Sequence, residues 1–161
     1  MIGVPPPERP GEGNGAALTP IRWSADLECG IAAIDIEHQT LVALYNDLVR
    51  AVGHGTSGWM TRSVLHTLKN HFLDHVAHEE RWMRTADYPG HQAHRDAHEG
   101  AARMLESIVA DPDAQRAVHA AGRHLRDWIM EHIAVTDRDF FAFLNAAGTA
   151  PPAASGAQAD D

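Results

Sequence analysis

Residues 75–98 have the sequence HVAHEERWMRTADYPGHQAHRDAH, and this stretch decides the fold. Its centre, DYPG, is a turn signal between two segments with helical periodicity. His75 and Glu79 lie four residues apart before the turn, and His94 and His98 lie four apart after it. Each pair therefore projects from one face of a helix, with side chains about 6 Å apart. The stretch predicts two helices joined by a short turn, each with polar residues on one face.

Four segments of the chain repeat apolar residues at three- and four-residue steps, which predicts helices over 34–52, 59–85, 91–110 and 114–146. The predicted inward faces are Ile34, His38, Leu41, Tyr45, Leu48 and Val52; Leu65, Leu68, Phe72, His75, Glu79 and Trp82 or Met83; His94, His98, Ala101, Leu105 and Ile108; and Val118, Leu125, Trp128, His132, Val135 and Phe143. Helices joined by short loops bury such faces against one another. We therefore expect an all-α fold, an antiparallel up-down-up-down four-helix bundle.

The predicted bundle forms one domain, residues 21–146, between two tails. Residues 1–20 and 147–161 are rich in Pro, Gly, Ala and Ser, a composition typical of disorder. No apolar run approaches the roughly 18 residues of a membrane span, and the start of the chain lacks the features of a secretory signal. We expect a cytoplasmic protein without a membrane span, and we expect it to be a monomer.

Charge and composition narrow the function classes. The chain has 13 Lys and Arg against 22 Asp and Glu, and the net charge of −9 argues against sequence-independent binding of nucleic acid. Its single cysteine, Cys29, cannot form an internal disulfide. The unusual count is that of the 12 histidines, because histidine is the commonest metal ligand and also titrates near neutrality.

Polar residues interrupt the inward face of every predicted helix. His38 does so in 34–52 and His132 in 114–146, while the pairs described above interrupt the other two helices. An imidazole or carboxylate on a core face is costly unless it is paired or binds a metal. Interruptions on all four helices favour a shared metal site. Five imidazoles with one or two carboxylates would suit a pair of first-row transition ions.

The spacing alone leaves other interpretations open. With so many histidines, an HxxxH or HxxxE pair is expected by chance, and a lone histidine on a core face is more often hydrogen-bonded to a neighbour. Neighbouring histidines also offer competing registers. His71 lies four residues before His75, His78 lies three after it, and His91 lies three before His94.

Four motifs occur in order between residues 23 and 143. They are Trp23 followed by Gly30-Ile31 and IDIEHQ (34–39); HVAHEERWM (75–83); Tyr88-Pro89 followed by HRDAH (94–98); and WIMEHI (128–133) followed by Asp137. Together they resemble the motifs of the bacterial hemerythrins, members of the hemerythrin-like HHE cation-binding family. The resemblance covers all of the predicted domain.

The resemblance implies a non-haem di-iron centre bridged by carboxylates and by an oxo or hydroxo group. The positions that match the family's ligands are His94, His98 and His132 for one iron, His38 and His75 for the other, and Glu79 and Asp137 as bridges. The second iron is then one ligand short and binds dioxygen. The resemblance thus implies a reversible oxygen carrier, store or local supplier rather than an enzyme. An oxygen-consuming protein would be its further partner.

Three positions depart from a simple pattern. Asp137 lies five residues after His132, about 140° around a regular helix, and a long reach or a local π-bulge could accommodate it. Val76 stands where the family commonly has Phe, which could widen the pocket. Glu37 stands where the family often has Gln, and we interpret this as a surface change.

The aromatic residues and the remaining histidines have simpler interpretations. Trp128 and Phe72 are predicted to point toward the metal, although either alone also fits an ordinary core. His71, one turn from His75, could support that ligand. The histidines without a family role, expected to face solvent for the most part, are His54, His66, His71, His78, His91, His119 and His124.

Other functions remain as alternatives. A di-iron enzyme that consumes peroxide or nitric oxide would use the same ligands. An oxygen or redox sensor is disfavoured because no output domain is visible in the sequence. A zinc module is disfavoured because seven ligands suit two bridged ions better than one tetrahedral site.

Overall fold

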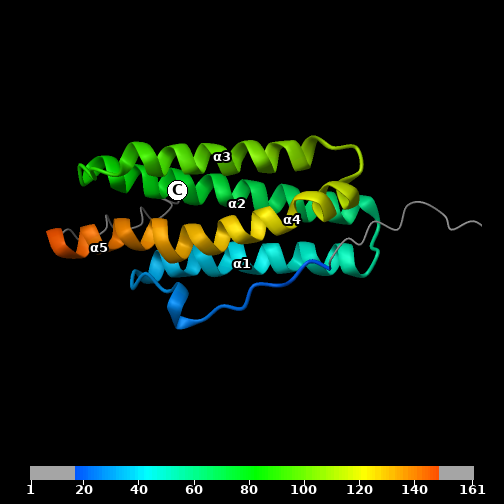
Figure 1. Cartoon of the computed structure of the whole chain (residues 1–161), viewed down its shortest axis with the longest axis horizontal. Coiled ribbons are helices and arrows are strands. Elements are labelled where there is room, and N and C mark those ends of the chain that lie inside the picture. Colours follow the sequence, from blue (N-terminus) through cyan, green and yellow to red (C-terminus); the bar gives the residue numbers. More distant parts are fainter. Residues whose placement is uncertain (1–16, 149–161) are drawn as a thin grey trace, which may run out of the picture.

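The computed structural model describes residues 17–148, and its long helices lie side by side as a bundle (Figure 1). A short 3-10 turn, η1 (Ala25–Leu27), precedes the first of them. The helices are α1 (Ala32–Gly53), α2 (Gly58–Thr85), α3 (His91–Ala110) and α4 (Ala114–Glu131), which continues through a π-helical turn, η2 (His132–Asp137), into α5 (Arg138–Ala147). The described residues contain no strand.

Consecutive helices pack against each other, and α4 closes the bundle against α1. Since short loops connect neighbours that lie side by side, the chain runs up and down in turn (Figure 1). The predicted all-α up-down-up-down bundle is confirmed, and the ends of its helices lie within two residues of the predicted ones. None of the helices between residues 17 and 148 has both the length and the apolar character that a membrane span requires.

Side chains and one glycine stabilise the ends of three helices. The guanidinium of Arg62 donates to the carbonyls of Val109 and Asp111, at 2.9 and 3.0 Å, and so satisfies acceptors at the end of α3. Asp113 caps the start of α4 by accepting from the backbone N–H of Arg116 at 3.0 Å. Gly148 follows α5 with φ +63°, the left-handed conformation that glycine adopts without strain.

The core consists of two apolar clusters with a polar layer between them. The larger cluster includes Leu41, Phe72, Leu105 and Ile133. The smaller one, at the other end, consists of Ile34, Trp82, Met83, Phe140, Phe141 and Leu144. On each of three helices, the buried polar residues lie between members of the two clusters: His38 on α1, His75 and Glu79 on α2, and Asp137 at the end of η2.

The predicted inward face fails in one place, after His132. Val135 is 53% exposed rather than inward, and Phe143 is only partly buried, while Phe140, Phe141 and Leu144 are fully buried. The cause is the π-helical turn. A π turn holds one residue more than an α turn, so a pattern extrapolated at 3.6 residues per turn is out of phase beyond it.

A segment before α1 runs along the bundle (Figure 1, blue). Ile21 and the Asn46 amide exchange two hydrogen bonds of 2.8 Å, and Leu18 lies so close to Gly122 that a Cβ there would meet it at 2.9 Å. Most of the predicted tails, residues 1–16 and 149–161, lies outside the described residues. Their disorder stays a prediction.

Candidate metal centre

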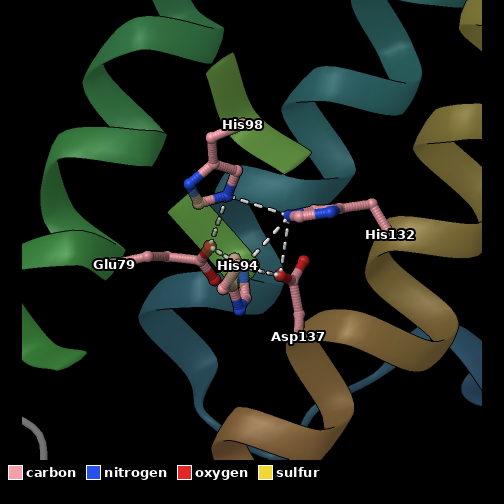
Figure 2. A group of neighbouring side chains, drawn as sticks. All are labelled: Glu79, His94, His98, His132 and Asp137. Atoms are coloured by element: carbon pink, nitrogen blue, oxygen red, sulfur yellow. Dashed lines mark hydrogen bonds and ion pairs between the residues drawn. The ribbon is translucent and has the colours of Figure 1, made fainter. Parts of the chain in front are cut away.

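The structure brings all seven predicted ligands into one layer of the bundle. Each is buried, and none is more than 4% exposed. Figure 2 shows five of them pointing toward one another from three parts of the chain. The contributing elements are α1 with His38, α2 with His75 and Glu79, α3 with His94 and His98, and η2 with His132 and Asp137. The competing registers through His71, His78 and His91 do not join this layer.

The first group able to hold a metal consists of Glu79, His94, His98, His132 and Asp137, whose ligand atoms all lie within 4.8 Å of one another. The Nε2 atom of His132 lies 3.2 Å from Nε2 of His94 and 2.9 Å from Nε2 of His98. Two imidazole nitrogens at right angles on one ion, with bonds of about 2.1 Å, lie about 3.0 Å apart. The spacing therefore fits nitrogens that share an ion.

The second group consists of His38, His75, Glu79 and Asp137, and it shares both carboxylates with the first. Asp137 shows how the sharing works. Its Oδ1 lies 3.0 Å from Nε2 of both His94 and His132, whereas its Oδ2 lies 3.1 Å from Nε2 of His38. One oxygen thus faces each group, so Asp137 could hold ions in both.

Glu79 also lies between the groups. Its Oε2 is 3.4 Å from Nε2 of His98, 3.5 Å from that of His94 and 3.6 Å from that of His75. Among the described residues, all four carboxylate oxygens of Glu79 and Asp137 are buried without a hydrogen-bond partner. Within residues 17–148, their only counter-charges are the imidazoles that face them, when these are protonated. Buried charges are costly unless they are paired, and bound cations would pair them. The residues present therefore fit a pair of metal ions.

The π-helical turn explains how Asp137 reaches this layer. His132 begins the turn and Asp137 ends it, and both side chains are buried. On a regular helix, five residues would rotate the carboxylate about 140° away from the imidazole. The wider turn brings the two back to one side. Of the two explanations that the sequence left open, the structure shows the π-bulge.

Opposite charges in this layer shift its pKa values. Burial opposes protonation of His75, but the carboxylates of Glu79, Glu37 and Asp137 together outweigh it and raise the pKa of His75 to about 9. Burial likewise opposes the charge on His94, whose contacts with Asp137 and Glu79 raise its pKa to about 9. Despite burial and the nearby Asp137, the imidazoles lower the pKa of Glu79 to about 2. The metal-free layer thus holds imidazolium–carboxylate pairs.

Metal binding is therefore expected to release protons. A pH of 7 lies below the raised pKa values of His75 and His94, so both imidazoles are protonated. A metal ion binds only the neutral imidazole. Metal affinity should rise with pH up to about 9 and fall as the pH is lowered. Titrating the metal-free protein with a ferrous salt, anaerobically and in weak buffer with a pH dye, measures the release. Metal binding without proton release, with an affinity independent of pH, would contradict the expected pKa values.

Glu37 is a neighbour of the site that the sequence interpretation missed. Its side chain is only 21% exposed, and its Oε2 accepts from Nδ1 of His75 at 2.9 Å. Its Oε1 accepts from Nδ1 of His78 at 2.8 Å, and its backbone carbonyl accepts from Nε2 of His71 at 2.9 Å. Interpreting Glu37 as a surface change was wrong. A signal was available in the 71, 75, 78 spacing, which places three histidines on one side of α2.

Aromatic rings pack against the side of the centre that carries His98 and His132, in line with the prediction that Trp128 and Phe72 point toward the metal. Trp128 stacks on His132 with ring centres 4.3 Å apart and an angle of 17°. Phe72 meets Trp128 edge-on at 5.6 Å and lies 6.4 Å from the ring of His98. A surface hollow of about 190 Å³, lined by Ala97, Trp128, Glu131, His132 and Thr136, reaches the outer side of His132.

The bundle and its two groups with shared carboxylates define a class of helical proteins with a histidine-rich metal-binding centre. A family model described as Hemerythrin HHE cation binding domain matches residues 29–144. The chain belongs to this family, as the four motifs indicated.

Known proteins of the family resemble the chain over most of its length. A bacteriohemerythrin of Ralstonia nicotianae is 30% identical over 131 residues, which cover 77% of this chain and 88% of that protein. A hemerythrin of Sipunculus nudus is 26% identical over 118 residues, 73% of this chain and 88% of its own length. A bacteriohemerythrin of Pseudomonas paraeruginosa is 29% identical over 119 residues, 73% and 77% of the two chains.

Proposed function

We propose that this protein binds dioxygen reversibly at a di-iron centre. The proposed ligands are the seven residues described above: His94, His98 and His132 on one iron, His38 and His75 on the other, and Glu79 and Asp137 as bridges. The observation that carries the proposal is the inequality of the two groups. One has five members and the other four, with both carboxylates in common. An ion held by the smaller group would have fewer protein ligands and so would leave a position for a small molecule.

The chemistry of the donors supports iron and oxygen. Imidazole suits iron among the first-row metals, and iron, when bound, supplies a redox-active position that a small ligand can occupy. Five imidazoles against two carboxylates keep the negative charge of the centre low, which favours reversible binding over oxidation of other molecules. In the family that the motifs resemble, such a centre binds dioxygen.

The surroundings limit the access of solvent to the centre. The candidate ligands are buried, and the rings of Trp128 and Phe72 pack beside His132 and His98. Solvent access and polarity around a metal tune its reactivity. We propose a role as a carrier, store or local supplier of oxygen, in a monomeric cytoplasmic protein that passes oxygen to an oxygen-consuming partner.

An optical titration tests this function. The iron-loaded, reduced protein is exposed to oxygen and then purged with argon over several cycles. We expect a visible absorption band that appears with oxygen and disappears on purging with little loss of amplitude, because the buried centre releases its ligand unchanged. The measurement is the band amplitude per cycle, with His66→Ala, an exposed site on α2, as a control variant.

Two results would contradict reversible binding. One is a single, irreversible conversion to the oxidised protein on first exposure. The other is rapid, sustained consumption of added peroxide or nitric oxide, which would assign the centre to an enzyme with the same ligands.

A further inference from the structure

One residue of α1 holds three histidines of α2. Each carboxylate oxygen of Glu37 accepts from a different imidazole, Oε2 from His75 and Oε1 from His78, while the carbonyl of Glu37 accepts from His71. His78 is at the surface, with a side chain 46% exposed, and His75 is in the buried layer. The contacts therefore form a continuous connection from the surface to one candidate ligand.

His75 differs from other candidate ligands in the partner of its Nδ1 atom. All five histidines turn Nε2 toward the shared carboxylates, so Nδ1 is the atom that faces away. Among the described residues, Nδ1 of His38, His94 and His98 is buried without a hydrogen-bond partner. The nearest comparable contact is that of His98 Nδ1 with Glu80 Oε1, at 3.5 Å, too long for a good hydrogen bond. His75 has its carboxylate at 2.9 Å.

We propose that Glu37 is a positioning residue for His75, held in place by His71 and His78. By accepting the Nδ1 proton, the carboxylate fixes the tautomer of His75 that leaves the Nε2 lone pair facing the centre. It also fixes the orientation of the ring and makes the imidazole a stronger donor. The effect falls on the group with fewer ligands, and the inference rests on the proposal that His75 ligates iron there.

The surrounding histidines fix the conformation of the Glu37 side chain. A glutamate side chain loses rotamer freedom when it is fixed, and an isolated surface glutamate would sample several rotamers. Here His78 occupies Oε1, which leaves Oε2 for His75. His71 ties the backbone of Glu37 to α2 at the same level. A histidine-rich surface thus has a specific use near the centre.

Variants of Glu37 separate its charge from its hydrogen bond. Glu37→Gln retains an acceptor for His75 but removes the negative charge, and Glu37→Ala removes both. The matched control is Glu99→Gln, an exposed carboxylate on α3 that pairs with Arg95. Two quantities are measured on each iron-loaded protein: the iron retained against increasing chelator, and the reduction potential of the centre by redox titration.

We expect Glu37→Ala to weaken the retention of one of the two irons by about 10- to 100-fold, while the other iron and the helical content are unchanged. Glu37→Gln should keep both irons but shift the potential to more positive values, because a weaker donor stabilises the ferric state less. His78→Ala should shift it in the same direction by a smaller amount. Glu99→Gln should match the wild type.

Wild-type potential and retention in both Glu37 variants would overturn the inference. If Glu37→Ala fails to fold, Glu37→Gln decides, and an unchanged potential in that folded variant overturns it as well. The result is distinguishable from failure of the proposed function. If oxygen binding proves irreversible in the wild type while the Glu37 variants still change iron retention, only the proposed function fails. If oxygen binding is reversible while the Glu37 variants match the wild type, only this inference fails.

Discussion

Replacing His94 with alanine is expected to remove most of the iron from the protein while the bundle stays folded. Nε2 of His94 lies 3.0 Å from Asp137 Oδ1, 3.5 Å from Glu79 Oε2 and 3.2 Å from Nε2 of His132. The substitution thus removes a proposed ligand and also the neighbour of both shared carboxylates. Iron affinity should fall by more than the roughly 10- to 100-fold typical of losing an outer partner of a ligand.

The measurement is the ratio of iron to protein after gel filtration, with far-UV circular dichroism to confirm helical content. His66→Ala is the matched control, because it makes the same chemical change at an exposed position of α2. It should retain two irons per chain, as we expect of the wild type. Equal loss from both variants would show that His94 is not a ligand.

Removing the metal from the wild-type protein with a chelator is expected to lower Tm by about 10 °C. A ligand that binds only the folded state at about 1,000 times its Kd stabilises that state by about 4.1 kcal/mol. For a chain of this size, each kcal/mol shifts Tm by about 2–4 °C. The structural reason is the polar layer, in which Glu79 and Asp137 are fully buried and have no hydrogen-bond partner among the described residues.

Differential scanning calorimetry of the metal-free and reloaded protein measures this shift. Ferrous iron should restore the original Tm, and the chelator should have little effect on His94→Ala, which we expect to have lost its iron already. A metal-free protein that melts within about 2 °C of the loaded one, a small shift by the scale above, would show that the buried carboxylates do not depend on a cation.

The periodicity of the sequence was sufficient to predict the bundle. Leu41, Leu65 and Leu105 are buried where their spacing predicted, because a regular helix repeats the same geometry over many residues. The candidate ligands came together for a related reason. His38 and the pairs on α2 and α3 occupy positions of the same inward faces, so packing of those faces also brings the polar residues into one layer.

Two features were not settled by the sequence, for different physical reasons: the π turn, which was one of two explanations left open, and the contacts of Glu37. The π turn depends on the position that Asp137 takes in the assembled layer, and no local spacing between His132 and Asp137 specifies it. Val135 was consequently assigned to the wrong side. Glu37 is one position away from the inward face of its own helix, and its partners lie 34 to 41 residues away along the chain. Contacts between helices are not encoded in the period of either one.

The π-helical turn also sets where the chain can change in length. Within η2 the loss of one residue would convert a five-residue interval into a four-residue one, which a regular helix closes on the same side. Phe140, Phe141 and Leu144 would then keep their buried positions. In α4 the same loss would turn everything beyond it by about 100°. During divergence of related chains, η2 is therefore a natural site for a single-residue deletion that leaves the rest of the helix in register.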